Sequence, residues 1–470
     1  AQERLASQVA PAPALPPLAV EAIIHAPGAV SSLALDAHTH TLVAQIAPEP
    51  CAPTPLTTHC GAPITSQSGL AFYDSATGAL RSQSLWSPSD TAHVLTDTTH
   101  GATYIISSGS VTIYSDATGK QADKYSSSLD KNLQSAALDG RTGMIYTVSD
   151  SDIALNAFDA ATGQQVASAP LPPPSAGGTL GSEIRVDESA GRVYVYNDNA
   201  MNPTLYAFNA SDLTPLGSWR LPGRGGSLGA LDAATHTLYL GVSQLDLTTL
   251  PADGAGEQVS AEQTIQSAML RGASHFGVDS ATGALVLMTE TGIEVYAANS
   301  VQPYAALPLV RASSISATDV TPWLLPIDTI SRLAYAPGDD NTILIVSLAP
   351  PTGHAAPNLL TAEVMARAAM AKLLPDTNQN PPFISAETFP IGTGTVERQY
   401  FIHYSDLGWK GPYAGTASVS GVKAGATAGD YTMTFSITWN QLFLRQHSWT
   451  VEVTPDRRVH LMADSGDAIP

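Results

Sequence analysis

A short pattern recurs along most of this chain and restricts the folds that the chain can adopt. Its first copy, LALDAHTHTLV at Leu33 to Val43, reads as an apolar strand, a tight turn opened by an aspartate, and a second apolar strand. The aspartates of six copies are Asp36, Asp97, Asp139, Asp187, Asp232 and Asp279, at intervals of 61, 42, 48, 45 and 47 residues. Such a period is typical of a β-propeller blade of four short strands. We interpret these aspartates as turn-forming residues, and a looser copy from Ala334 (AYAPGDDNTILIV) brings the count to seven blades.

Most repeats carry a second hairpin after the first. It occurs as GLAFYDSATGALRS from Gly69, VTIYSDATGKQADKY from Val111 and LNAFDAATGQQVAS from Leu155, with weaker copies from Leu205 and Ile293. In an Asp-x-x-Thr-Gly turn the aspartate accepts backbone N–H bonds, and the glycine takes the positive φ that ends the turn. Each repeat therefore predicts two hairpins, which together make one blade.

The two ends of the repeat region complement each other. A lone apolar strand at residues 18–25 precedes the first blade, whereas the last blade, at residues 330–348, shows only two clear strands. Propellers commonly close by letting one terminus add a strand to the blade built by the other, which removes exposed sheet edges. We expect residues 18–25 to supply the missing outer strand.

These paired hairpins resemble the YVTN/YncE-like group of seven-bladed propellers over about residues 18–350. The resemblance implies an architecture and leaves the function open, because lyases, quinoprotein dehydrogenases, sugar-binding modules and scaffolds share this fold.

The fold class that follows is mainly β: a seven-bladed β-propeller with terminal strand closure, followed by a small α+β domain. The predicted units are an extended Ala/Pro-rich tail at 1–17, the propeller at 18–350, a linker at 351–357 and a C-terminal domain at 358–470. A tail of this composition is ordered only when something holds it. We therefore expect it to dock on its own domain or on a neighbouring molecule.

The C-terminal domain opens with the strongest helix signal of the chain, residues 358–374, with Asn358 as its N-cap and Pro375 as its stop. Strand-like runs follow, and the last is a hairpin that turns at residues 454–457. One helix with about four antiparallel strands resembles a cystatin-like or NTF2-like domain. Within the propeller, residues 245–269 interrupt the fifth blade, and we interpret them as a decorating loop or short helix.

Composition excludes some classes of partner. The chain has 21 basic and 41 acidic residues and a formal charge of −20, which argues against nucleic acid and anionic membranes. No apolar run approaches the ~20 residues that a transmembrane helix needs. We expect no cofactor, and partners that are copies of this chain or other surface proteins.

The two cysteines indicate an oxidising compartment. Cys51 and Cys60 flank a Pro/Thr-rich loop, where we expect a disulfide, although free thiols remain the alternative. The chain begins at Ala1, which we interpret as the result of signal-peptide removal. Both features predict a secreted, extracellular or cell-surface protein.

Candidate chemical groups have simple structural explanations. His40, His100 and His236 stand where other repeats carry Gly143, Gly191 and Gly283, so we interpret them as left-handed turn residues. We expect no metal site, although the pair His38 and His40 and the acidic runs at 150–152 and 339–340 are possible cation ligands. The C-terminal aromatics Trp409, Tyr413, Trp439 and Trp449 favour a core over a sugar platform.

Two hypotheses of function follow. The sequence lacks HExxH, GxSxG, Walker, CxxCH and GxGxxG-helix motifs, so its catalytic residues are unknown. This favours a non-catalytic scaffold, a subunit of a filament-like extracellular or cell-surface assembly held by the tail and the C-terminal domain. The alternative is a propeller enzyme, a lyase or hydrolase, or a carbohydrate- or peptide-binding module, with its site in the central funnel.

Overall fold

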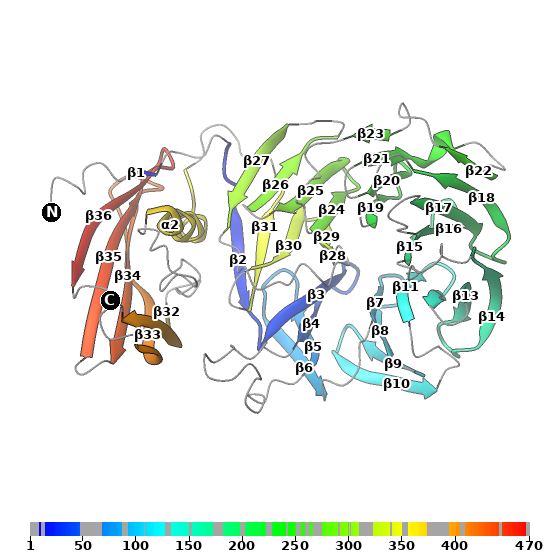
Figure 1. Cartoon of the computed structure of the whole chain (residues 1–470), viewed down its shortest axis with the longest axis horizontal. Coiled ribbons are helices and arrows are strands. Elements are labelled where there is room, and N and C mark those ends of the chain that lie inside the picture. The colour runs from blue at the N-terminus through cyan, green and yellow to red at the C-terminus, as the bar shows by residue number, and fades with distance from the viewer. Residues whose placement is uncertain are drawn as a thin grey trace.

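The computed structural model describes most of the chain. The residues described are 9–10, 15–47, 68–86, 93–107, 109–126, 133–149, 153–172, 182–197, 203–221, 228–240, 243–250, 255–258, 264–266, 275–289, 292–298, 300, 302–309, 323–338, 341–349, 356–373, 394–404, 409–440 and 444–466. Within them the strands form eight sheets, seven of which follow one another around a ring (Figure 1).

The first three blades each contain four antiparallel strands in sequence order. Blade 1 consists of β3 (Ala29–Asp36), β4 (Thr41–Ala47), β5 (Ser68–Asp74) and β6 (Leu80–Trp86); blade 2 of β7 (His93–Asp97), β8 (Ala102–Ser107), β9 (Ser110–Ser115) and β10 (Lys120–Ser126); blade 3 of β11 (Leu133–Asp139), β12 (Met144–Ser149), β13 (Ala154–Asp159) and β14 (Gln165–Pro170). The first strands of adjacent blades lie against one another, which places them nearest the centre of the ring.

The next three blades keep this plan with additions. Blade 4 consists of β15 (Ser182–Asp187), β16 (Arg192–Asn197), β17 (Thr204–Asn209), β18 (Pro215–Arg220) and β22 (Ala255–Gln258); blade 5 of β19 (Leu228–Asp232), β20 (Thr237–Leu240), β21 (Ser243–Asp246) and β23 (Thr264–Gln266); blade 6 of β24 (His275–Asp279), β25 (Ala284–Thr289), β26 (Gly292–Tyr296), β27 (Pro303–Pro308) and β28 (Trp323–Leu324). The interruption at 245–269 is therefore more than a loop. It contains the 3-10 turn η1 (Leu247–Thr249). Its strand β22 pairs in parallel with β18 of blade 4, and its strand β23 pairs with β21 of blade 5.

The seventh blade confirms the predicted strand closure. Its chain-order strands are β29 (Ile327–Asp328), β30 (Leu333–Pro337) and β31 (Thr342–Ser347), and the outer strand is β2 (Val20–His25), antiparallel to β31. The first residues of the propeller thus pair with its last ones, as Figure 1 shows by the contact of blue β2 with yellow β31.

The repeat predicted from Ala334 is wrong in register. The first hairpin of blade 7 turns at Asp328, whose Oδ1 accepts from the amides of Ile330 and Ser331 at 2.9 and 3.2 Å. The run that starts at Ala334 contains the second and third strands instead, β30 and β31. Asp328 lies 49 residues after Asp279, as the period requires.

Within the propeller, each cluster of buried apolar side chains combines residues of two neighbouring blades. At one seam, Val43, Leu70 and Phe72 of blade 1 pack with Ile105 and Tyr114 of blade 2. Tyrosine hydroxyls join other seams through backbone carbonyls. Tyr146 OH donates to Ala210 O at 2.7 Å, and Tyr335 OH donates to Ser75 O at 3.1 Å, across the blade 7–blade 1 closure.

The eighth sheet forms the C-terminal module with one helix, α2 (Leu359–Leu373). Its strand order is β1-β36-β35-β34-β33-β32, with β32 (Gly394–Tyr404), β33 (Trp409–Ala424), β34 (Tyr431–Asn440), β35 (Leu444–Val453), β36 (Val459–Gly466) and β1 (Val9–Ala10). The prediction of about four strands was one short, and the N-terminal tail adds a sixth. The resemblance to cystatin-like or NTF2-like domains stays a prediction.

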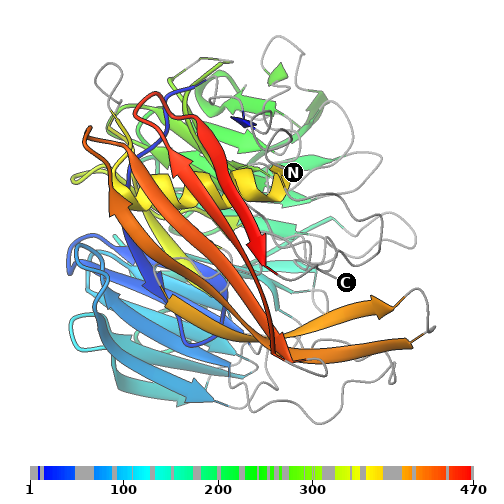
Figure 2. The ribbon, with the colours of Figure 1, turned by 90° about the vertical axis from the view of Figure 1, so that its left-hand side faces the viewer.

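Helix α2 lies between this sheet and the propeller (Figures 1 and 2). Ala362, Ala366 and Met370 pack on the sheet, whereas Val364 packs on blades 6 and 7. All ten residues 361–370 are buried, as expected for a helix that is covered on both sides. None of the helices among the described residues is long and apolar enough to cross a membrane.

Polar contacts fix the start of α2 on the closing strand β2. Asn358 Oδ1 accepts from the amide of Thr361 at 2.8 Å, which confirms the predicted N-cap. The Asn358 side chain also donates to Val20 O at 3.0 Å, and the amide of Val20 donates to Thr361 Oγ1 at 2.9 Å. The same strand therefore closes the propeller and anchors the C-terminal helix.

Thr361→Val tests this anchor. The valine keeps the shape of the side chain but leaves the buried amide of Val20 without its acceptor, so the free energy of unfolding should fall by about 1–3 kcal/mol. Denaturant titration measures the loss, and hydrogen exchange should locate it at Val20. Thr432→Val, at a half-buried position on the face of β34 opposite the core residues Met433 and Phe435, should change stability by less than about 0.5 kcal/mol. Equal effects of the two variants would contradict the anchor.

Candidate functional site

The turn aspartates are buried and act within their own turns. Asp36, Asp97, Asp139, Asp187, Asp232 and Asp279 are at most 1% exposed. Asp36 is typical: Oδ1 accepts from the amides of His38 and Thr39 at 2.9 and 3.2 Å, and Oδ2 accepts from Thr39 Oγ1 at 2.6 Å. These carboxylates hold the chain reversal between the first two strands of a blade, so they are engaged before any ligand arrives.

The histidine prediction is confirmed at two positions and wrong at one. His40 and His236 have φ of 51° and 53°, in the left-handed region. In blade 2, however, Gly101 takes that conformation with φ of 64°, and His100 precedes it. His100 instead places Nδ1 2.8 Å from Oδ2 of Asp97 in its own turn.

Two of these turn positions also connect neighbouring blades. His236 Nδ1 lies 2.6 Å from Oδ2 of Asp187 in blade 4, and Arg332 Nε donates to Oδ2 of Asp279 in blade 6 at 3.3 Å. Burial opposes ionisation of Asp187, but hydrogen bonds from Ser189 and His236 outweigh it and lower the pKa of Asp187. A side chain at the left-handed position thus binds the turn aspartate of the preceding blade, so His236 and Arg332 connect adjacent blades.

Charged and imidazole groups on the inner strands were not singled out from the sequence, because no motif marks an inner strand. Arg185 and Glu183 of β15 form an ion pair at 3.7 Å, and both side chains are 14% exposed. His93 Nε2, at the start of β7, lies 3.5 Å from Leu133 O of blade 3, and burial lowers the pKa of His93. The contact of His93 with Leu133 lies at the seam between blades 2 and 3, and the ion pair lies within blade 4, so these contacts do not join the two groups into a single site.

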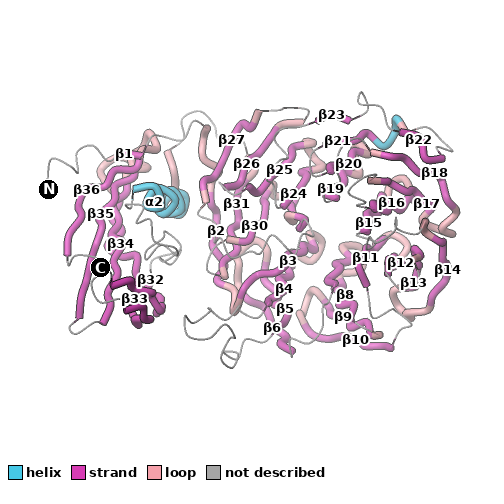
Figure 3. The backbone as a smooth tube through the Cα atoms, viewed as in Figure 1, coloured by secondary structure: helices cyan, strands magenta, loops and turns pink. Residues whose placement is uncertain are grey.

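A segment of the chain itself enters the ring of inner strands. β28 pairs in parallel with β24, through His275 with Trp323 and Phe276 with Leu324, and it also lies against β3 and β19. The amide of Leu325 then donates to Phe276 O at 2.6 Å. Inner strands of blades 1, 5 and 6 therefore surround β28, near the centre of the ring in Figure 3.

Gly277 is adapted to this segment. A Cβ atom built on it would lie 2.7 Å from Leu325 O and 2.8 Å from a methyl carbon of Ile327. The equivalent positions of the first five blades carry side chains, namely Ala34, Leu95, Ala137, Arg185 and Ala230. Only where the connection to blade 7 crosses the inner strand is the side chain absent.

Several predicted groups lie outside the described residues. These are Cys51, Cys60 and the acidic runs at 150–152 and 339–340. Within the described part, no group of three or more metal-ligating side chains is close enough to hold an ion, and His38 and His40 are exposed. Trp449 belongs to the core beneath α2, as predicted. The side chains of Trp409, Tyr413 and Trp439 are not described.

Comparison with known proteins shows the fold. No family model and no curated protein matches this chain. The β-propeller domain of Cps50 (Swd1) from Myceliophteria thermophila is 11% identical with a TM-score of 0.50, and the match covers 71% of this chain and all of that one (100%). Raptor from Chaetomium thermophilum is 10% identical with a TM-score of 0.49 over 71% of this chain and 29% of Raptor. At 11% identity the likeness to the Cps50 domain shows a β-propeller architecture alone, and membership of the YVTN/YncE-like group stays a prediction.

Gly277→Ala tests the packing of the central segment. The added methyl overlaps Leu325 O, so we expect a loss of about 1–3 kcal/mol in the free energy of unfolding. Hydrogen exchange should accelerate first at the amide of Leu325, while the amide of Val295 in β26 keeps its protection. Uniform acceleration across blade 6, or none, would contradict the close approach.

Proposed function

We propose that this chain is a non-catalytic interaction scaffold, a secreted subunit of an extracellular or cell-surface assembly. The observation that carries the proposal is the route of the N-terminal segment. It pairs as β1 with β36, then exchanges backbone bonds with β27 through Pro16 and Leu18, and finally becomes β2. One terminal peptide joins three sheets by strand addition, a binding mode that needs no catalytic chemistry.

The contact of β1 with the C-terminal sheet is the weakest of these joints. It covers two residues of β36, Val459 and His460, out of the eight in that strand. The joints with the propeller are stronger, because Leu18 and Val20 are buried at 1% and 0% exposure. In our proposal, β1 leaves its own sheet and pairs with β36 of the next molecule.

Such an exchange repeats the same contact between molecules. Because donor and acceptor surfaces differ, the contact is heterologous, and repetition gives rings or open filaments. Export to an oxidising compartment belongs to the same proposal and rests on the predicted disulfide of Cys51 with Cys60.

The occupied centre of the propeller favours this function over an enzyme with a site in the funnel. Propeller sites of that kind need side chains from several blades to converge on open space. Here β28 lies among the inner strands of blades 1, 5 and 6. The partly exposed pair Glu183 and Arg185 would be the first residues to test if a small ligand were found.

Two truncations test the assembly. Removal of residues 1–8 keeps β1, whereas removal of residues 1–14 deletes it and leaves the closing strand in place. Light scattering and negative-stain microscopy should show higher-order assemblies for the full chain and the shorter truncation, and monomers for the longer one.

Circular dichroism should show that both truncated proteins keep a folded propeller, because Leu18 and β2 remain. Assembly by the protein that lacks residues 1–14 would reject the exchange mechanism. A full-length chain that stays monomeric at high concentration would reject the assembly itself.

A further inference from the structure

Blade 2 differs from its neighbours at a buried position in the second hairpin. There, a backbone amide donates to the carbonyl of the left-handed residue in the first turn of the same blade. The donors and acceptors are Ser75 with His40 at 3.0 Å, Asp116 with Gly101 at 2.9 Å, Ala160 with Gly143 at 2.8 Å, Ala210 with Gly191 at 2.9 Å and Leu247 with His236 at 2.9 Å. All five residues are at most 3% exposed, yet only Asp116 is ionisable.

A second exception in blade 2 faces the first. Thr103 is the sixth residue after the turn aspartate, where the other blades through blade 6 carry Leu42, Ile145, Val193, Leu238 and Leu285. Thr103 is buried at 0% exposure, and its Oγ1 donates to Asp116 Oδ1 at 2.6 Å. In blade 2, the hydroxyl of Thr103 thus takes the place of an aliphatic side chain. The carboxyl group of Asp116 takes the place of a small or apolar side chain.

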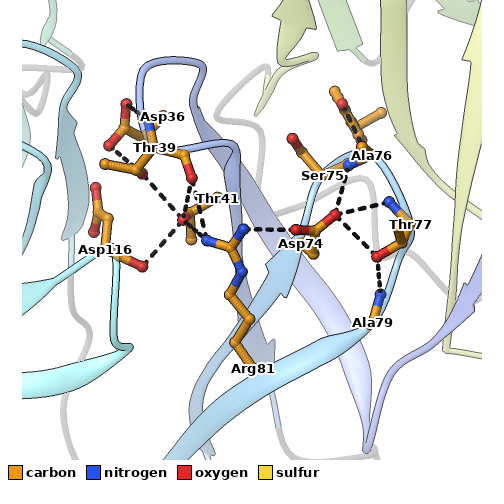
Figure 4. A network of polar contacts seen from close by, with 11 residues as sticks. Asp36, Thr39, Thr41, Asp74, Ser75, Ala76, Thr77, Ala79, Arg81 and Asp116 are labelled. Carbon is orange, nitrogen blue, oxygen red and sulfur yellow. Dashed lines mark hydrogen bonds and ion pairs between the residues drawn. The ribbon is translucent and has the colours of Figure 1, made fainter.

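One oxygen of Asp116 lacks a donor. Its backbone O accepts from Thr41 Oγ1 of blade 1 at 3.0 Å, and Oδ1 is bound by Thr103, but Oδ2 has no hydrogen-bond partner in the structure. Asp36 of blade 1, also 0% exposed, adjoins Asp116 through two threonines: Thr39 Oγ1 donates to Asp36 Oδ2 and lies 3.0 Å from Thr41 Oγ1, which donates to Asp116 O (Figure 4). Two carboxylates cannot bond to each other without a proton, and an unpaired buried oxygen is costly.

The surroundings decide which of the two carboxyls holds a proton. The side chain of Asp36 already accepts hydrogen bonds from two backbone amides and the hydroxyl of Thr39, so both of its oxygens have donors. Asp116 accepts one hydroxyl. Burial, reinforced by the Asp36 and Asp97 carboxylates, raises the pKa of Asp116 to about 7.

We propose that Asp116 and Asp36 form a proton-binding site in the seam between blades 1 and 2, in which Asp116 Oδ2–H donates to Asp36. The proton supplies the missing donor, and its release leaves two buried carboxylates facing each other across the seam. The ligand of the site is therefore a single proton, and the consequence of its loss is a weaker seam.

The other charged and titratable groups around the pair bind other partners or are exposed. The guanidinium of Arg81 donates to Thr39 O, Thr41 Oγ1 and Asp74 Oδ2, and His100 contacts Asp97. On the turn of Asp36, His38 and His40 are exposed. The contribution of Asp116 is therefore measured as a difference between variants that keep all of these groups.

The direction of the pH effect follows from proton linkage. Folded Asp116 holds a proton more tightly than the unfolded chain does, so the stabilisation is complete below the ordinary pKa of 3.8 and is lost as the pH rises to about 7. Between these values, each unit of acidification raises the ratio of folded to unfolded protein by up to roughly tenfold from this group. Above about pH 7 the penalty is constant.

Asp116→Asn tests the site in the full chain. The asparagine amide reproduces the protonated acid, since it accepts from Thr103 and donates to Asp36. Its denaturation midpoint should exceed that of the unmodified protein by a wide margin at pH 8 and by a smaller margin at pH 5, because the unmodified protein regains stability as the pH falls. Thr103→Val with Asp116→Ala restores residues found in neighbouring blades and should also flatten the profile. Asp123→Asn removes an exposed charge from the same blade and should leave the profile unchanged.

Infrared spectroscopy gives a second readout that does not depend on stability. The unmodified protein at pH 6 should show the carbonyl band of a protonated carboxylic acid, which fades as the pH rises through about 7 and is absent from Asp116→Asn. The proposal is overturned if that band is missing at pH 6, or if Asp116→Asn is less stable than the unmodified protein at pH 8.

Discussion

The antiparallel pairing of β2 with β31 is the interaction on which the rest of the structure depends. A propeller blade has apolar residues on both faces, so each blade needs a neighbour on either side and the ring has to close. Ile24 from the start of the propeller packs with Tyr335 and Ile345 from its end and with Leu42 of blade 1, which completes the last seam. Because β2 also binds Thr361 and Asn358, the position of the C-terminal module follows from the same strand.

The seams show how one repeated turn supports different local chemistry. The aspartate at the start of each first turn is occupied by its own loop, whereas the left-handed position varies among glycine, histidine and arginine. Where it is His236 or Arg332, it binds the aspartate of the preceding blade. At the seam between blades 1 and 2 the variation lies instead in Asp116, since the residues at the equivalent position of other blades are small or apolar. Individual blades are thus distinguished by a few buried polar residues on a common framework.

Much of the fold could be predicted from local patterns, because turn chemistry and strand alternation are short-range. The period, the closing strand and the cap at Asn358 all belong to this class. The turn at Asp328 was missed, because Arg332 occupies its left-handed position where glycine or histidine was expected. The sequence did not single out Asp116, because in SDATG the aspartate lies one residue after the position that it occupies in DSATG and DAATG.

The remaining features depend on contacts between distant parts of the chain. The parallel pairs of β22 with β18 and of β28 with β24 leave no periodic signal in the sequence. In the sequence, the pairing of β28 with β24 is marked only by Gly277. The reason for a glycine there becomes clear only when Leu325 O is placed next to it. The ion pair of Glu183 with Arg185 is likewise visible only after the inner strands are placed around the ring. Function at such sites is set by tertiary neighbours, which a linear motif does not record.

The single strand β2 unites the ring and the C-terminal module. Native-state hydrogen exchange across a denaturant series tests it most directly, because segments that open together share one free energy of opening. Amides of β2, β31 and α2 should merge into a single opening unit. Opening of α2 well below the denaturant concentration that releases β2 would contradict it, and would make the C-terminal module an independent attachment.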